Sequence, residues 1–281
     1  MILYYIRRNP DPEIINIFGI SIRYYGLLFV GGLILCIYIL GRIYKRENIP
    51  SEHLEKLTIF CLIGIIAGAR LGHCLFYEPS YYLSHPLEMI LPVTFPPDGG
   101  IKFTGYQGLA SHGGVSGLLI ALYFYSRETK HSMLDAIDLI AVVAGLSFGF
   151  IRLGNFMNSE IIGTPTTLPW GVVFERVDNI PRHPAQLYEA ISYFIIFAIM
   201  MLLYKKMRAR LKNGFLFGLA TVLFFTARFL IEFVKENQVG FEEEMTLNMG
   251  QLLSLPFIAV GIGFIIYGIM KTRRSLIADI R

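Results

Sequence analysis

The sequence has few charged residues for its length. Of its 281 residues only 16% are charged, 54% are hydrophobic, and the mean hydropathy is +0.54. Soluble globular domains carry about a quarter charged residues, so this deficit excludes an ordinary water-soluble protein and indicates a chain that folds in lipid. The net charge of +4 is small, and we expect no nucleic-acid partner.

Patterns that bind metals or form disulfides are also missing. The three cysteines, Cys36, Cys61 and Cys74, lie in apolar runs, where free Cys behaves as a small buried hydrophobe. The six histidines lack ligand spacing, and the chain has no HExxH, GxSxG or P-loop motif. We therefore expect neither a metal nor a cofactor. A cleavable signal peptide is not expected either, because the first long apolar run begins only near Tyr24.

Long apolar runs dominate the chain instead. A transmembrane helix needs about 20 mostly apolar residues, since the hydrocarbon core is roughly 30 Å thick and a helix rises about 1.5 Å per residue. The sequence therefore predicts an all-α protein with seven transmembrane helices, forming a single domain over residues 1–281. The predicted spans are Tyr24–Ile43, Leu57–Phe76, Gly108–Tyr125, Leu134–Ile151, Ala185–Tyr204, Gly214–Val234 and Met249–Met270.

The distribution of Lys and Arg predicts the orientation of these spans, because cytoplasmic loops carry an excess of both. Alternate loops and the C-terminal tail hold 15 of the 25 basic residues in short segments, whereas the N-terminus and the other loops hold 7. We therefore expect an extracytoplasmic N-terminus, a cytoplasmic C-terminus, and two extracytoplasmic polar segments, 78–107 and 153–184. The densest cytoplasmic cluster is Lys205, Lys206, Arg208, Arg210 and Lys212.

On the extracytoplasmic side, three arginines lie within the predicted spans or at their edges. They are Arg70, Arg152 and Arg228. An Arg at the bilayer centre costs about 2.5–3.5 kcal/mol on insertion scales, so one that persists faces a cavity, a partner or a ligand. Guanidinium groups match phosphate oxygens, which in a membrane belong to lipid headgroups. The alternative is an internal Arg228–Glu232 ion pair with Arg70 reaching to the interface.

Other polar residues gather at the same predicted level. His112 stands in Ser111-His112-Gly113-Gly114, where the third span begins, and a neutral imidazole there can accept a proton. A lone His near a helix end is more often structural. The segment after the fourth span adds two amides and a carboxylate, Asn155, Asn158 and Glu160.

These residues lie in motifs that closely resemble bacterial prolipoprotein diacylglyceryl transferases. The strongest match is the run from Gly149 to Gly163, which is similar to the family's G-R-x-G-N-F-x-N-x-E-x-x-G stretch. Further matches follow in the family's order: Tyr24-Tyr25-Gly26-Leu27, Gly68-Ala69-Arg70-Leu71-Gly72, His112-Gly113-Gly114, Arg182-His183-Pro184-Ala185-Gln186-Leu187-Tyr188-Glu189, Arg228-Phe229-Leu230-Ile231-Glu232-Phe233 and Met249-Gly250-Gln251-Leu252-Leu253-Ser254-Leu255-Pro256.

The resemblance implies a reaction and its partners. The diacylglyceryl group of phosphatidylglycerol moves to the thiol of the lipobox cysteine in a preprolipoprotein, a thioether forms, and glycerol phosphate leaves. The place is the bacterial inner membrane, with membrane lipid around the chain and the active site toward the extracytoplasmic side. A thiol with a pKa of about 8.5 is helped by a nearby base, and the leaving phosphate by arginines.

The resemblance also implies roles for individual residues. The catalytic group is His112 as base with Arg152 and Arg228 as phosphate clamps. Residues implied to bind or support the substrate are Tyr25, Arg70, Asn155, Asn158, Glu160, Gly163 and Glu232.

Other classes of membrane protein stay open at this stage. One alternative is a seven-helix receptor or retinal protein, and retinal is disfavoured because the last span, Met249–Met270, contains no Lys for a Schiff base. A transporter commonly shows repeated halves and binds near the midplane, whereas these polar residues lie toward one face. A protein that binds anionic lipid without catalysis is the remaining alternative.

Overall fold

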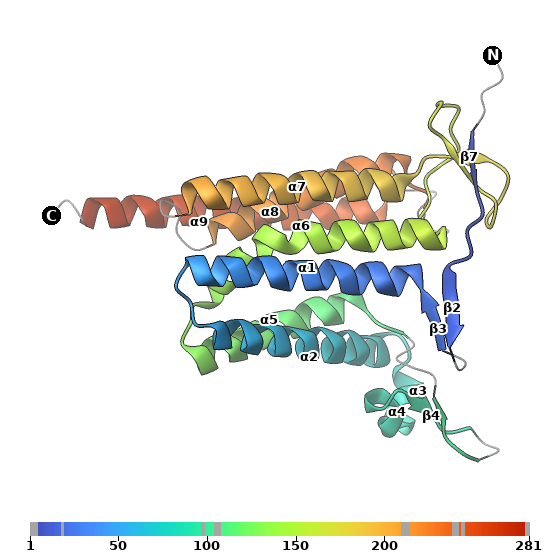
Figure 1. Cartoon of the computed structure of the whole chain (residues 1–281), viewed down its shortest axis with the longest axis horizontal. Helices are drawn as coiled ribbons and strands as arrows, with labels where there is room; N and C mark the ends of the chain where they lie inside the picture. The colour runs from blue at the N-terminus through green and yellow to red at the C-terminus, as the bar shows by residue number, and fades with distance from the viewer. Residues whose placement is uncertain are drawn as a thin grey trace. The chain divides into compact units, whose positions relative to one another are not determined.

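The computed structural model describes residues 5–17, 20–96, 99–103, 108–208, 214–237, 242 and 245–278. Long helices make up most of it (Figure 1). They are α1 Tyr24–Arg46, α2 Ser51–Phe76, α5 Ser111–Thr129, α6 Met133–Asn158, α7 Ala185–Met207, α8 Phe215–Ile231 and α9 Met249–Ala278. Each contains most of one predicted span, so the helical prediction is confirmed for all seven.

Six of these helices are long and apolar enough to cross a membrane, counting only described residues: α1, α2, α6, α7, α8 extended to Val234, and α9. Helix α5 is not among them, because it opens with Ser111, His112 and two glycines and ends with Arg127 and Glu128. The apolar helices support a multi-pass membrane protein. The seventh span and the orientation of the termini stay predictions.

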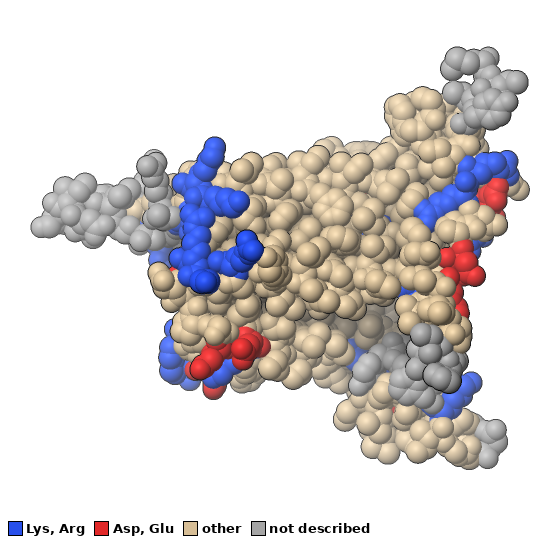
Figure 2. Space-filling model, viewed as in Figure 1, with Lys and Arg blue, Asp and Glu red and all other residues tan. Residues whose placement is uncertain are grey.

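Basic side chains lie at the ends of α1 and α7. On the face that Figure 2 shows, Lys and Arg gather where α1 and α7 end, and the middle of both helices carries no charged side chain. The last turn of α1 holds Lys45 and Arg46, and that of α7 holds Lys205 and Lys206. Such an arrangement keeps the charges in water and leaves uncharged surface for lipid. The other members of the predicted cytoplasmic cluster, Arg210 and Lys212, lie outside the described residues.

In the described part, seven short strands and three short helical segments lie before the first long helix or between the long helices. Strand β1 (Ile6–Arg8) pairs in parallel with β6 (Val172–Phe174), which pairs antiparallel with β7 (Pro181–Arg182). The hairpins are β2 (Glu13–Ile17) with β3 (Ile20–Arg23) and β4 (Val93–Thr94) with β5 (Lys102–Phe103). The short helices are α3 (Pro79–Ser84), α4 (Pro86–Ile90) and the 3₁₀ turn η1 (Glu232–Val234). These strands are too short to show a periodic pattern in the sequence, and the all-α prediction did not include them.

The chain divides into two compact units, residues 1–40 with 137–281 and residues 41–136. In the second unit, α2 packs on α5 through glycines. A Cβ at Gly68 would clash with the carbonyl oxygen of Gly113, and one at Gly117 would clash with the carbonyl oxygen of Gly64. Small residues allow such close backbone approach, which is how membrane helices commonly associate.

The first unit contains the arginine-rich motifs. Its helices α7, α8 and α9 lie side by side (Figure 1), with α8 packed along α9 at Gly218 and Gly261. Gly145 of α6 meets the backbone of α7, where a Cβ would lie 2.5 Å from the carbonyl oxygen of Tyr193. These close contacts bring the ends of α6, α7 and α8 together and position the polar cluster described next.

Candidate active site

The end of α6 carries the polar residues of the longest motif. The sequence predicted that this span ends at Ile151, but the helix continues to Asn158, and Phe156 in this last stretch packs against the buried cluster of Ile162, Val172 and Phe174. Arg152, Asn155 and Asn158 therefore lie on helix and not in a loop, at positions three residues apart that share a face. The predicted loop 153–184 is shorter by this final stretch of α6.

A tight helix terminus turns Glu160 back toward α6. The Ser159 amide donates to Phe156 at 3.2 Å and the Glu160 amide donates to Asn155 at 3.0 Å, which is the Schellman pattern. Ser159 and Ile161 both adopt left-handed φ values of 57°. Such a conformation is unusual for a β-branched Ile, and backbone strain of this kind concentrates at functional sites.

The returned carboxylate closes a chain of hydrogen bonds. Arg152 Nη1 donates to Asn155 Oδ1 at 3.2 Å, and Asn155 Nδ2 donates to Glu160 Oε2 at 3.1 Å. Asn158 Nδ2 donates to the other oxygen, Oε1, at 3.0 Å. Gln186 of α7 holds the Glu160 carbonyl at 2.5 Å. The structure thus brings together four of the predicted site residues, each oriented by the next.

Arg152 also belongs to a buried ion cluster, formed by Arg152, Glu189, Lys235 and Glu232. Arg152 Nε lies 3.0 Å from Glu189 Oε2, and Lys235 Nζ lies 3.7 Å from Glu189 Oε1 and 3.2 Å from Glu232 Oε2. Glu189 is completely buried, and Glu232 and Lys235 are 6% and 7% exposed. Two cations and two carboxylates balance, as buried charges require.

Arg228 stands beside this cluster without a partner of its own. Within the described part of the chain its guanidinium makes no hydrogen bond or ion pair, and its Nε is buried. Glu232, four residues on, pairs with Lys235 instead, so the alternative of an internal Arg228–Glu232 pair is wrong. The Tyr193 phenol lies within electrostatic range of Arg228, Arg152 and Glu189, which places both arginines around one side chain. The four charges of the cluster pair with one another, and Arg228 has no ion-pair partner among the described residues.

Tyr25 packs on the same end of α6. A Cβ at Gly154 would lie 2.8 Å from the Tyr25 ring, so only Gly allows this contact. The phenol lies within electrostatic range of Glu160 and Arg152. Tyr25 therefore belongs to the polar group, as the sequence predicted.

Gly163 contributes its backbone. Its amide donates to the His183 carbonyl at 2.9 Å, and its own carbonyl accepts a hydrogen bond from Arg182 at 3.3 Å. A Cβ there would meet His183 and Val234 within 2.6 Å. Arg182 also binds Asp178 at 2.6 Å, and this hydrogen bond holds the pKa of the Asp178 carboxyl below its usual value. Gly163 thus joins the strand after α6 to the turn after α8.

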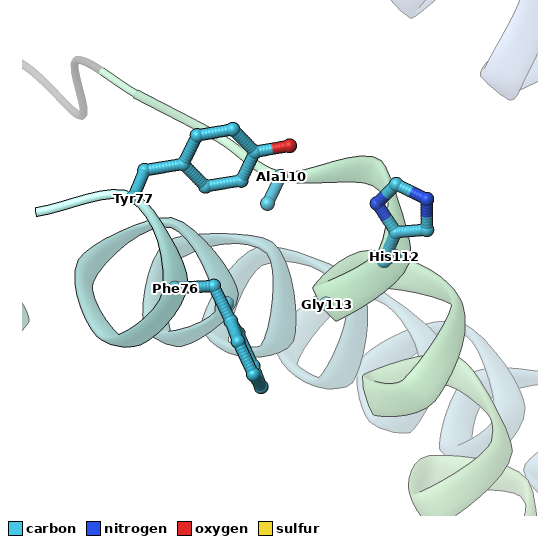
Figure 3. Close-up of a pocket in the computed structure, with 6 residues that line it drawn as sticks. Phe76, Tyr77, Ala110, His112 and Gly113 are labelled. Atoms are coloured by element: carbon cyan, nitrogen blue, oxygen red, sulfur yellow. The ribbon is translucent and has the colours of Figure 1, made fainter. Parts of the chain in front are cut away.

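His112 belongs to the second unit and lies in the first turn of α5. Its side chain is exposed and makes no hydrogen bond or ion pair within the described residues. Figure 3 shows the ring projecting from the helix end, beside Tyr77. It borders an open hollow of about 350 Å³ together with Gly72, Phe76, Tyr77, Ala110 and Gly113. An exposed imidazole is accessible to a substrate thiol, and its role as base stays a prediction.

Arg70, in the same unit, holds a neighbouring segment. Its Nη2 donates to the Glu88 carbonyl at 2.6 Å and its Nε to the Met89 carbonyl at 3.3 Å, and the guanidinium covers the Tyr82 ring at 4.8 Å. These carbonyls lie in the last turn of α4, where helices lack internal partners. The Phe95 amide binds the Glu88 carboxylate and lowers its pKa. This geometry favours a supporting role for Arg70.

Sequence reasoning missed Glu189 and Lys235. Glu189 lies inside an apolar span, where a charge is costly, and the argument that selected the three arginines applies equally to it. Lys235 lies directly after a predicted span and gives no local signal, because its partners are on α7 and at the end of α8.

Comparison with known proteins identifies the family of this chain. Residues 12–267 match the family model described as prolipoprotein diacylglyceryl transferase. The phosphatidylglycerol–prolipoprotein diacylglyceryl transferase of Bacteroides fragilis is 56% identical over 266 residues, which cover 95% of this chain and 96% of the relative. The same enzyme of Tolumonas auensis is 44% identical over 90% of this chain and 94% of the relative, and that of Chloroherpeton thalassium 40% over 96% of each. The predicted resemblance is confirmed: the chain belongs to the prolipoprotein diacylglyceryl transferase family.

Proposed function

We propose that this protein transfers the diacylglyceryl group of phosphatidylglycerol to the lipobox cysteine of preprolipoproteins, the first step of bacterial lipoprotein maturation. The observation that carries the proposal is Arg228, an unpaired guanidinium beside a neutral ion cluster at the ends of apolar helices. An anionic lipid headgroup supplies the charge that Arg228 lacks. Family membership, and the names of the relatives, support the same lipid and acceptor.

The chemistry requires stabilisation of growing negative charge. The cysteine sulfur forms a bond to the terminal glyceryl carbon, the carbon–oxygen bond to phosphate breaks, and the thiol proton passes to a base. The phosphodiester carries one negative charge, and the glycerol phosphate that leaves carries about two. Guanidinium groups placed at that phosphate before reaction stabilise the transition state more than the bound lipid.

The clamp consists of Arg152 and Arg228, which come from different helices. Arg152 is oriented by Glu189 and Asn155, so it does not need to reorganise when the phosphate binds. Arg228 has no competing partner among the described residues. A fork of N–H donors from each side matches the tetrahedral array of phosphate oxygens.

The remaining polar residues have orienting roles in the proposal. Asn155, Asn158 and Glu160 hold the glycerol headgroup through hydroxyl contacts, since amide and carboxylate groups bind hydroxyls well. Tyr25 supports this group from α1. Gly163, Glu232 and Arg70 support the backbone and the clamp.

His112 is proposed as the base that takes the thiol proton. A neutral imidazole within hydrogen-bond reach of the thiol raises the fraction of thiolate, which is the nucleophile. Its exposure on α5 is consistent with this role. A His112→Gln variant is therefore expected to transfer slowly at neutral pH and to recover part of its rate as pH rises and the thiol ionises in water.

The proposed place is the bacterial inner membrane, with membrane lipid as the solvent of the helices. Seven spans, an extracytoplasmic N-terminus and a cytoplasmic C-terminus put the polar cluster on the extracytoplasmic side, where the lipobox arrives after translocation. This requires α5 to cross the membrane. Its glycine contacts with α2 support that arrangement, because α5 then needs little lipid-facing surface.

One experiment tests the function directly. The purified protein is incubated with phosphatidylglycerol and a lipobox peptide, and the peptide is weighed by mass spectrometry while glycerol phosphate is counted. We expect one diacylglyceryl group per peptide and one glycerol phosphate released. A peptide with Ser in place of Cys is the matched control. Phosphatidylglycerol binding without any gain in peptide mass would instead support the non-catalytic lipid-binding alternative.

A further inference from the structure

Arg228 and Glu232 have the spacing of an ion pair but do not form one. They lie four residues apart at the end of α8, where a cation and an anion on one helix face normally attract. Glu232 is 6% exposed, so its carboxylate needs a counter-charge. The structure supplies that charge from Lys235, 3.2 Å away, and Arg228 is left without a partner among the described residues.

The backbone explains why Glu232 turns away from Arg228. At Glu232 the chain changes from α-helix to the 3₁₀ turn η1, in which residues three apart align, and the Lys235 amide donates to the Glu232 carbonyl at 3.3 Å. Gly250 of α9 makes room for the carboxylate, since a Cβ there would clash with it. Glu232 is thus directed toward Lys235 by both its own turn and α9.

Lys235 is itself held in place by its neighbours. Residues 163 and 235 form an antiparallel bridge, the Thr164 amide donates to Val234 at 3.0 Å, and the Glu236 amide donates to Ile162 at 3.1 Å. The ammonium group lies between Glu232 and Glu189. A compact ammonium with three donors suits two carboxylates on different sides.

We propose that Lys235 is a positioning residue that holds the Glu232 carboxylate away from Arg228 and so keeps Arg228 available for the lipid phosphate. This inference rests on the proposed function. Without Lys235, Glu232 is a buried carboxylate with Arg228 as the cation one turn away on its own helix. Arg228 then pairs with Glu232, and the phosphate has to compete with that internal carboxylate.

The test is a double-mutant cycle between Lys235 and Glu232. In the wild-type background, Lys235→Met is expected to raise the KM for phosphatidylglycerol and lower transfer by about 10–100-fold, less than the about 10²–10³ for losing one preorganised donor outright, because Arg228 is still present. In a Glu232→Gln background the same change is expected to cost less than about threefold, because no carboxylate remains to capture Arg228. Lys235→Arg, which keeps the charge, is the conservative control and is expected to retain most of the affinity.

The cycle separates positioning from a purely structural role. If Lys235→Met alone does not fold, the Lys235→Met/Glu232→Gln double variant is compared with Glu232→Gln alone. The double variant is expected to fold because it has no unpaired carboxylate at position 232. Near-equal transfer by these two supports the proposal. Equal large losses from Lys235→Met in both backgrounds would overturn it, because they would show that Lys235 acts independently of Glu232.

A second measurement distinguishes failure of the inference from failure of the proposed function. Phosphatidylglycerol bound per protein is counted by native mass spectrometry without peptide. If the wild-type protein never modifies the lipobox peptide, the function fails. The positioning role stands in that case only if Lys235→Met loses bound lipid and Glu232→Gln restores it, and it fails if lipid binding is unchanged in every variant.

Discussion

Arg152 and Arg228 are expected to respond differently to replacement by Gln, although both are proposed to bind one phosphate. Arg152 Nε lies 3.0 Å from Glu189, which is completely buried. Arg152→Gln therefore leaves a buried carboxylate whose remaining ion-pair partner among the described residues is Lys235, at 3.7 Å. Arg228 has no partner in the described part of the chain, so its replacement strands no charge.

The magnitudes follow from this difference. Removing one partner of a buried ion pair costs about 3–5 kcal/mol, and because Lys235 still faces Glu189 we expect Arg152→Gln to cost about 3 kcal/mol of unfolding free energy. Arg228→Gln is expected to change stability by only about 0.5 kcal/mol, in either direction. Transfer should nevertheless fall by about 10²–10³ in both, and the double variant should lose less than the product of the single losses, because both groups act on one phosphate.

Stability is measured by denaturant unfolding and thermal melting in detergent, and transfer by single turnover to a lipobox peptide at saturating phosphatidylglycerol. The matched control is Arg152→Gln combined with Glu189→Gln, which removes the stranded carboxylate and should recover stability without recovering transfer. Equal destabilisation by the two single Gln variants would refute the partner assignment. Normal transfer by folded Arg228→Gln would remove the clamp from the mechanism.

Four further outcomes are expected. On a cysteine-free background, a Cys at Asn179 should react with an impermeant maleimide in intact spheroplasts and one at Lys206 only after permeabilisation; the opposite pattern would reverse the topology. Gly68→Ala should destabilise the protein by about 1–3 kcal/mol through overpacking against α5, whereas Gly31→Ala, with nothing within 4 Å of the added Cβ, should not. Thorough chelation of metal ions should leave transfer intact, because in the proposal guanidinium groups stabilise the negative charge on the leaving phosphate. Loss of transfer on chelation, with recovery on adding a divalent ion, would contradict this. The pKa of Asp178 is lower in the folded protein than its unfolded value of about 3.8, so its ionised carboxylate stabilises the fold at pH above 3.8, and this stability is lost as the pH falls through the folded pKa. Asp178→Asn should therefore make the stability of the protein depend less on pH in the acid range.

The sequence alone determined the helices and one part of the site. Long apolar runs predict helices because, in lipid, the backbone N–H and C=O groups of each run must hydrogen-bond to one another. All seven predicted spans are helical. Arg152, Asn155, Asn158 and Glu160 could be grouped in advance because they lie within nine residues at one helix end. Local spacing did not reveal where α6 stops, since the Schellman turn at Ser159 has no Gly to mark it.

Only the tertiary structure decided how the charges pair. Local spacing left open an ion pair between Arg228 and Glu232, yet Lys235 pairs with the Glu232 carboxylate and Glu189 of α7 pairs with Arg152 of α6. The energy of a buried charge depends on which counter-charges the packed helices bring within about 4 Å, and those come from segments distant in sequence. Arg228 therefore has no ion-pair partner in the part of the chain that the structure describes, and the proposed chemistry depends on this feature.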